Sequence, residues 1–167
     1  MKTGWFIGLA TAFYLAVVAY FWPIERQVVP VRAERSGYIQ AKILFSDTSI
    51  AVDIPTTLAT QELGLGGRKQ LSDSQGMYWT YTTPQRPSFW MKGMMIPLDF
   101  IWLRSGQVIE LTPDVPPPAD PKSRDLPILQ PSQSIDGVLE VPGGFIRRHH
   151  VSPGDVVAID QIPIGTL

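Results

Sequence analysis

Proline limits the possible fold of this chain more than any other feature. The 167 residues include 16 prolines and 14 glycines, residue types that end helices and form turns. Six of the prolines fall within residues 116–131, so this stretch cannot form a regular element. Elsewhere apolar and polar residues alternate in short runs, as in residues 39–45 and 50–54. We therefore expect a mainly β domain, either a compact sandwich or a partly open barrel, with one or two short helices.

Short runs of aromatic and β-forming residues mark the other expected strands. They lie at residues 77–82, 88–92, 98–103, 107–111, 138–141 and 156–159. Thr56 or Thr57 can cap a short helix that ends at Leu63, just before a glycine-rich turn. A second helical turn is expected within residues 143–150. These elements make residues 37–167 one β-rich domain, preceded by a polar linker at residues 24–36.

The N-terminal residues 1–23 form a separate segment. Residues 4–22 carry no formal charge, and as a helix they would rise about 28 Å, close to the hydrocarbon thickness of a bilayer. Aromatic residues stand at both ends of this run, as at membrane interfaces. The pattern favours a transmembrane anchor. A cleaved signal peptide is the alternative, and a buried core helix fits poorly because the run is apolar on every side.

Charge and cysteine content bear on location and partners. Arg26, Arg32 and Arg35 follow the apolar run, which by the positive-inside rule would place the domain in the cytoplasm. Glu25, the first charged residue after the run, and the absence of cysteine favour export, and we expect an exported domain. The net charge of −1 gives no support to a nucleic-acid partner. Without cysteine, disulfides, thiolate nucleophiles and cysteine-based zinc sites are excluded.

One segment resembles a known family signature. Residues 89–100 have the sequence Phe-Trp-Met-Lys-Gly-Met-Met-Ile-Pro-Leu-Asp-Phe. This is similar to the signature of domain of unknown function 192 (DUF 192), which has Phe-Trp-Met-Lys-Asn, two residues, then Pro-Leu-Asp. Further similar blocks follow the family's order, at residues 61–68, 76–79, 115–117, 138–144 and 153–155.

The resemblance covers residues 37–160 and implies a compact β-rich domain, often found behind a signal sequence or membrane anchor in bacteria. It implies no known reaction. Two positions depart from the family pattern: Gly93 replaces its Asn, and Gly66 replaces its Met.

Asp99 is the first candidate for a functional residue. It lies in a strand that is apolar on both faces, so its carboxylate needs a partner. Lys92, across the bend before Pro97, and Arg68 are the candidates. The sequence thus predicts a polar ligand-binding pocket of Arg68, Lys92 and Asp99 with Trp90 as its floor, for a small anionic or sugar-like ligand. The alternative is a structural ion pair with Trp90 as plain core.

Other functions rest on single features. Asp99 and Glu140 could form a carboxylate pair that hydrolyses envelope carbohydrate. The proline-rich loop could dock an envelope protein, which would make the chain an assembly factor. Clustered methionines with His149 and His150 could bind Cu(I), although methionine more commonly fills a core.

No nucleophile elbow, P-loop or dinucleotide motif is present. We therefore expect no catalytic residue, metal site or cofactor, and predict a membrane-tethered module that binds a small ligand or a partner.

Overall fold

The computed structural model describes residues 37–45, 48–120, 123 and 126–160. The predicted anchor and linker lie outside these residues. Within the part of the chain that is described, no helix is both long and apolar enough to cross a membrane. The elements are β1 (Tyr38–Phe45), β2 (Thr48–Pro55), α2 (Leu58–Leu63), β3 (Gln75–Gln85), β4 (Leu98–Arg104), β5 (Gln107–Val115), β6 (Ile135–Pro142), α3 (Phe145–Arg148) and β7 (Val157–Asp160).

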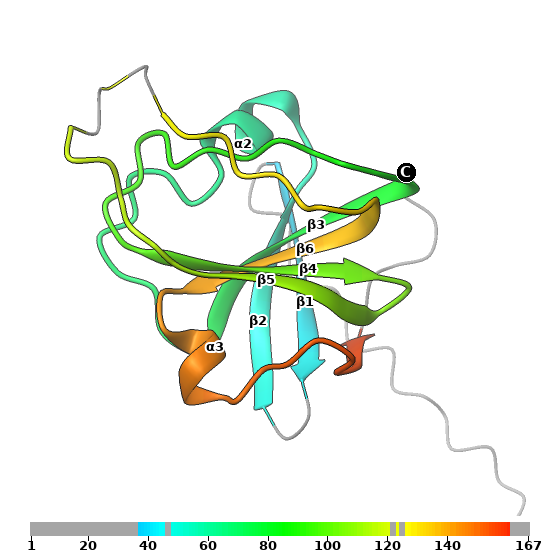
Figure 1. The fold of residues 1–167 in the computed structure, drawn as a ribbon. Coiled ribbons are helices and arrows are strands. Elements are labelled where there is room, and N and C mark those ends of the chain that lie inside the picture. Colours follow the sequence, from blue (N-terminus) through cyan, green and yellow to red (C-terminus); the bar gives the residue numbers. More distant parts are fainter. Residues whose placement is uncertain (1–36, 46–47, 121–122, 124–125, 161–167) are drawn as a thin grey trace, which may run out of the picture. The chain divides into compact units, whose positions relative to one another are not determined.

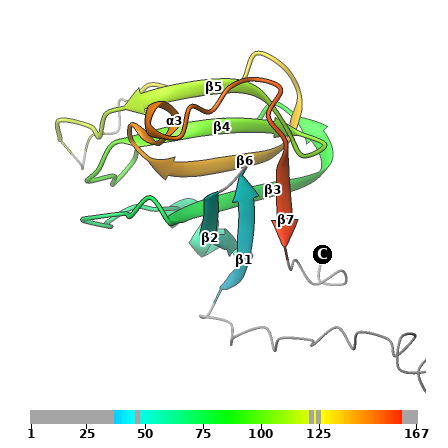
Figure 2. The ribbon, with the colours of Figure 1, turned by 90° about the horizontal axis from the view of Figure 1, so that it is seen from below.

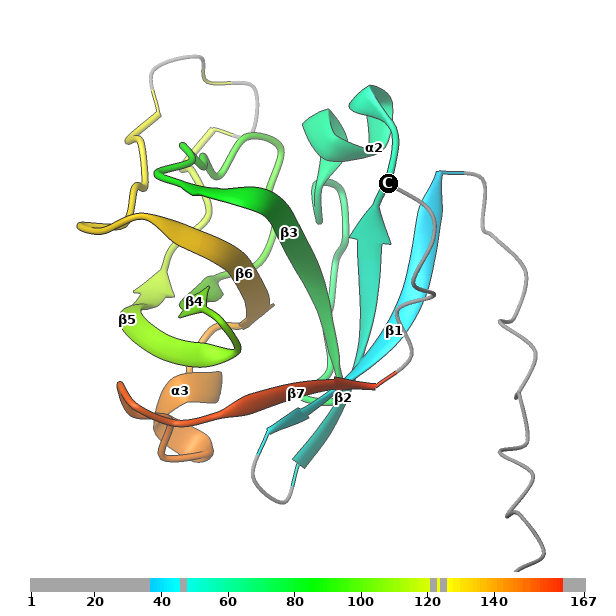
Figure 3. The same ribbon diagram turned by 90° about the vertical axis from the view of Figure 1, so that its right-hand side faces the viewer.

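The strands form one sheet in the order β5-β4-β6-β3-β2-β1-β7. Neighbouring strands are antiparallel except β2 and β3, which run parallel because the chain crosses over through α2 between them. The sheet curls strongly (Figures 1, 2 and 3) until its two edge strands approach each other. There Gln107 forms an isolated bridge with Val156, and the Val108 N–H donates to the Asp155 carbonyl at 2.9 Å. The fold is therefore a partly open barrel, one of the two predicted architectures.

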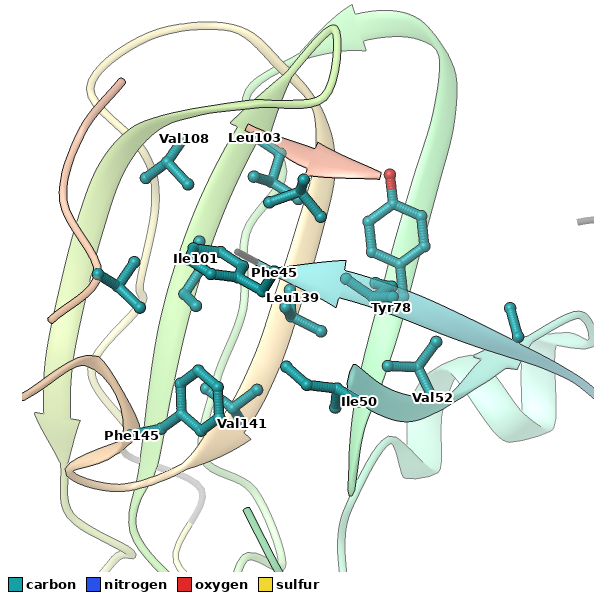
Figure 4. Close-up of a cluster of buried hydrophobic side chains, with 14 of the residues drawn as sticks. Phe45, Ile50, Val52, Tyr78, Ile101, Leu103, Val108, Leu139, Val141 and Phe145 are labelled. Carbon is teal, nitrogen blue, oxygen red and sulfur yellow. The ribbon is translucent and has the colours of Figure 1, made fainter. Parts of the chain in front are cut away.

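Alternation along the strands gives the sheet two apolar faces. The inner face builds a core at the centre of the curl (Figure 4), to which all of the central strands contribute. Its members include Phe45, Ile50, Val52, Tyr78, Ile101, Leu103, Leu139, Val141 and Phe145. This core explains why the strand runs in the sequence carry so few charges.

The outer face carries a second core around Phe100 and Trp102, whose rings stack at 5.7 Å between centroids. Two irregular segments cover it: residues 86–97 and the second part of the proline-rich loop. They are joined where Phe89 and Leu129 exchange backbone hydrogen bonds of 2.8 and 2.9 Å. The second half of the loop is therefore fixed to the segment that resembles the family signature.

Two local predictions compare directly with the structure. Thr57 caps α2, because its hydroxyl accepts a hydrogen bond from the Thr60 N–H at 3.2 Å, as the sequence indicated. The strand predicted at residues 88–92 is wrong: only Phe89 forms a bridge there. Pro87 and Gly93 bound this run closely, and the segment lies over the sheet instead of joining it.

Candidate binding pocket

A pocket opens on the outer face of the sheet, between α2 and the segment that resembles the family signature. Its cavity volume is about 130 Å³. A cavity of about 150 Å³ holds a benzene-sized ring, so this pocket has room for one small ring. The lining comes from α2 and its following turn, from residues 88–94, from β3 and from β6; it includes Glu62, Leu63, Trp79, Tyr81, Phe89, Trp90, Lys92, Met94 and Glu140.

The signature-like segment forms one wall because its side chains alternate. Phe89 and Met91 are buried in the outer core, whereas Trp90 is 50 % exposed. Phe89 is fixed by edge-to-face contacts with Trp79, Phe100 and Trp102, with centroid separations of 5.2, 5.8 and 5.8 Å. Trp90 and Lys92 are thereby left at the pocket wall, with the Lys92 Nζ 5.8 Å from the centre of the Trp90 ring.

Glu140 is the buried acidic group of the pocket, whereas Glu62 at its rim is exposed. Glu140 lies on β6 opposite Phe100 of β4, so both side chains face the outer core. The residue is only 5 % exposed yet contributes to the pocket lining. Burial raises the pKa of the Glu140 carboxyl to about 8, although the nearby Trp79 indole and the Arg68 guanidinium both act to lower it. At neutral pH the carboxyl is therefore mostly protonated.

Two aromatic residues of β3 stand beside this carboxyl. Trp79 acts on Glu140 as a hydrogen-bond donor that lowers its pKa, although the contact is too long or too bent for a normal hydrogen bond and Nε1 is buried. Burial, with the charge of Glu140, raises the pKa of Tyr81 to about 12. A buried donor without an acceptor costs about 1–3 kcal/mol. Among the described residues, the Trp79 indole is therefore a buried donor whose hydrogen bond is not fully formed.

Arg68 and Lys92 differ in how they relate to this pocket. Lys92 lines it, together with Trp90. Arg68 does not line it; its Nη2 forms an ion pair with Asp53 at 2.6 Å, although its charge still acts on Glu140. The structure thus brings two of the four predicted residues to one pocket and leaves the third close by.

Asp99, the fourth predicted residue, lies elsewhere. It is fully buried, and its oxygens accept hydrogen bonds from the backbone N–H groups of Asp114 (2.7 Å), Gly144 (3.0 Å) and Ile146 (2.8 Å). Gly144 is the N-cap of α3. Neither Lys92 nor Arg68 meets this carboxylate, because the backbone satisfies it. Asp99 therefore anchors the start of α3 to the strands β4 and β5.

The strand register also separates Asp99 from Glu140. Asp99 pairs with Val141, whereas Glu140 pairs with Phe100. Residues that pair across an antiparallel sheet point to the same face and sequence neighbours point to opposite faces. The two carboxyls therefore lie on opposite faces of the sheet. This corrects the expectation that they could share a cleft as a hydrolytic pair.

The methionines and histidines are likewise apart. Met77, Met91 and Met94 are buried in the outer core, at 0, 5 and 4 % exposure. His149 instead stacks on Phe145 of the inner core, with ring centroids 4.1 Å apart, and contacts Asp73. The structure does not bring these soft sulfur ligands to the imidazole. Met77, Met91 and Met94 fill the core, whereas Met95 is 50 % exposed.

Comparisons with known proteins agree with this architecture. The model of one family, DUF192 (Uncharacterized ACR, COG1430), matches residues 41–159. The chain belongs to the DUF192 family. A search of curated proteins found no match.

Two crystal structures resemble the DUF192 domain. One is a protein from Sinorhizobium meliloti 1021 described as a "putative transcription regulator"; it is 23 % identical, with a TM-score of 0.65, over 75 % of this chain and 98 % of that chain. The other is a protein of unknown function from Novosphingobium aromaticivorans DSM 12444, 27 % identical with a TM-score of 0.61, over 75 % of this chain and 89 % of that chain.

The two departures from the DUF192 signature have different local settings. Gly93 has a φ of +69°, and nothing lies within 4 Å of a Cβ placed there. Asn is among the few residues besides glycine that visit this left-handed region. A Cβ at Gly66 would instead meet the Leu63 carbonyl oxygen at 2.7 Å. The backbone of this DUF192 domain therefore accommodates the signature's Asn at residue 93, but it would have to shift for a side chain at residue 66.

Sequence reasoning did not place Glu140, Trp79 or Tyr81 in the ligand site. A signal for Glu140 was present: it is the one charged residue in the run Val138-Leu139-Glu140-Val141, whose other members are fully buried. Glutamate is almost never fully buried without a partner, so such a position marks a candidate site. Trp79 and Tyr81 carry no comparable signal, because aromatic residues are common in any strand.

Proposed function

We propose that this domain binds a small, sugar-like ligand in the pocket above Glu140. The observation that carries the proposal is a buried carboxyl without a charged partner of its own at a small cavity, with a half-exposed tryptophan in its wall. Buried polar groups are normally satisfied inside a protein. A ligand hydroxyl would exchange a hydrogen bond with the Glu140 carboxyl, beside the buried Trp79 indole.

Trp90 supports the same ligand class. A half-exposed tryptophan offers a flat apolar face, and the apolar face of a sugar ring can stack on it. The expectation also included small anions. We favour the sugar-like ligand because the pocket walls are mainly aromatic, and a flat aromatic face packs against a sugar ring better than against a small anion.

We also propose that the chain is tethered to a membrane and that its domain lies outside the cytoplasm. The tether and the location rest on the uncharged residues 4–22 of the sequence. Cell fractionation of the full chain and of a chain that begins at residue 30 would test the membrane tether, because only the full chain should remain with membranes. The transcription-regulator description belongs to the Sinorhizobium protein, and the net charge of −1 here does not favour a nucleic-acid partner.

The alternative function, docking of a partner protein by the proline-rich loop, is better tested by a point substitution than by deletion of the loop. Leu129 and Pro131 accept hydrogen bonds from Phe89 and Arg86, so removal of the loop would disturb the pocket wall. Ile128 is 57 % exposed within the same loop. Substituting Ile128 by Ser would test partner docking without removing these bonds.

The decisive experiment is an NMR titration that follows the indole N–H resonances of Trp79 and Trp90. A panel of monosaccharides is added to millimolar concentration, with Trp90→Ala as the variant. We expect saturable shifts of both indoles with at least one sugar, and loss of affinity by about fivefold in the variant, since stacking is worth about 1 kcal/mol. If no sugar in the panel shifts either indole, the proposed function is wrong.

A further inference from the structure

The carboxyl of Glu140 has no cationic partner of its own. Two basic side chains stand near the pocket: Arg68 forms its ion pair with Asp53, and the Lys92 Nζ lies 5.8 Å from the centre of the Trp90 ring. Among the described residues no ion pair includes Glu140, and the Trp79 indole beside it is a neutral donor. A buried carboxylate without a partner is strongly disfavoured, so this group is suited to receive a positive charge from outside.

The walls around this carboxyl are aromatic. Trp79, Tyr81, Phe89 and Trp90 all line the pocket. The faces of aromatic rings attract cations, and the attraction is larger where water is excluded. Phe89 and Trp79 hold each other edge to face, so this part of the wall is rigid. Aromatic walls with a carboxyl inside are the elements that recognise an organic ammonium ion.

We propose that the ligand of this pocket carries a primary ammonium group that pairs with Glu140, so that the natural ligand class is an amine-bearing sugar. This inference rests on the proposed function and specifies its ligand. The ammonium donates to the carboxylate, the Trp79 indole donates to the carboxylate or to an adjacent hydroxyl, and the ring lies against Trp90. The Glu140 carboxylate then has a charged partner.

Binding of such a ligand releases a proton. Because burial raises the pKa of Glu140 to about 8, the empty pocket holds a protonated carboxyl at pH 7, and pairing with an ammonium ion ionises it. The titratable or charged groups that face it are Tyr81 on β3, Arg68 and Glu62 from the α2 side, and Lys92 from the covering segment. The outward residues of β4, Leu98, Phe100 and Trp102, do not titrate.

The test compares each hexose with its 2-amino counterpart, for example glucose with glucosamine, by calorimetry. We expect the amino sugar to bind at least about tenfold more tightly than the neutral sugar at pH 7. Its affinity should rise about tenfold per pH unit from pH 5 to pH 7, since one proton is released over that range. The neutral sugar should show no such rise.

Two variants localise the effect. Glu140→Gln keeps the shape of the side chain but cannot ionise, so the preference for the amine and its pH dependence should disappear. Asp160→Asn removes an exposed carboxylate on β7, away from the pocket, and should keep both. Equal affinity for neutral and amino sugars in the unsubstituted protein overturns the ammonium inference and leaves the binding function intact. If no sugar of either kind binds, the proposed function itself fails.

Discussion

Asp99 and Glu140 lie on adjacent strands, and both are buried, but their surroundings are opposite. The Asp99 carboxylate accepts three backbone hydrogen bonds on the inner face, whereas the Glu140 carboxyl faces a cavity on the outer face. A buried carboxylate that the backbone satisfies is part of the scaffold. One that the protein leaves without a partner is a candidate for function. Burial alone does not separate the two roles; the donors around each group do.

The largest expected effect is on the inner face. Asp99→Ala leaves the N–H groups of Asp114, Gly144 and Ile146 without their acceptor and should lower the free energy of unfolding by about 3–5 kcal/mol. Urea denaturation measures this loss. A loss below about 1 kcal/mol would mean that the Asp99 carboxylate does not stabilise the fold.

Ionisation of the Glu140 carboxyl should lower the stability of the folded protein, whereas the Asp99 carboxylate raises it. The pKa of Glu140 in the folded protein, about 8, lies above its value of 4.5 in the unfolded chain. Between these values the folded state holds a proton that the unfolded state has lost, so stability falls as pH rises through this window. From pH 5 to pH 8 the unsubstituted protein should lose about 3–4 kcal/mol relative to Glu140→Gln.

Urea denaturation of both proteins at several pH values tests this slope. Groups that titrate elsewhere, such as Asp73, whose pKa is lowered by its hydrogen bonds from Arg148, contribute equally to both proteins and cancel. If the free energy of unfolding changes with pH in the same way in both proteins, the pKa of Glu140 is not raised by folding. Glu140 would then not differ from Asp99 in the way described.

The smallest expected effect is at Gly93, within residues 86–97 that cover the outer core. Gly93→Asn restores the residue of the family signature at a left-handed position with free space, so stability should change by no more than about 0.5 kcal/mol. Gly66→Ala is the matched contrast, because its Cβ would meet the Leu63 carbonyl oxygen, and it should cost more than 1 kcal/mol. Comparison of the melting temperatures of both variants would test whether the backbone tolerates a side chain at residue 93 but not at residue 66.

The sequence predicted the fold better than the site. Alternation in strands such as β1 and β4 is a local property, so the mainly β class and the two apolar faces of β4 could be predicted. The partners of Asp99 could not, because two of them belong to α3 and to β5, and backbone donors leave no trace in residue type. Trp90 and Lys92 were predicted from the signature-like segment. Glu140 entered only as half of a pair that the strand register excludes.

The pairing of β1 with β7 has a consequence for folding. Residues Lys42–Phe45 receive their second neighbouring strand from Val157–Asp160, at the other end of the domain sequence. Contacts between such distant segments form slowly, because the closure of a long loop must precede them. During synthesis β1 keeps an unpaired edge until β7 has left the ribosome, and a chain that stops before residue 157 keeps that edge permanently. Such an edge is a template for aggregation, so late truncations should yield insoluble protein even though the pocket and all of the inner core except Val157 are encoded upstream.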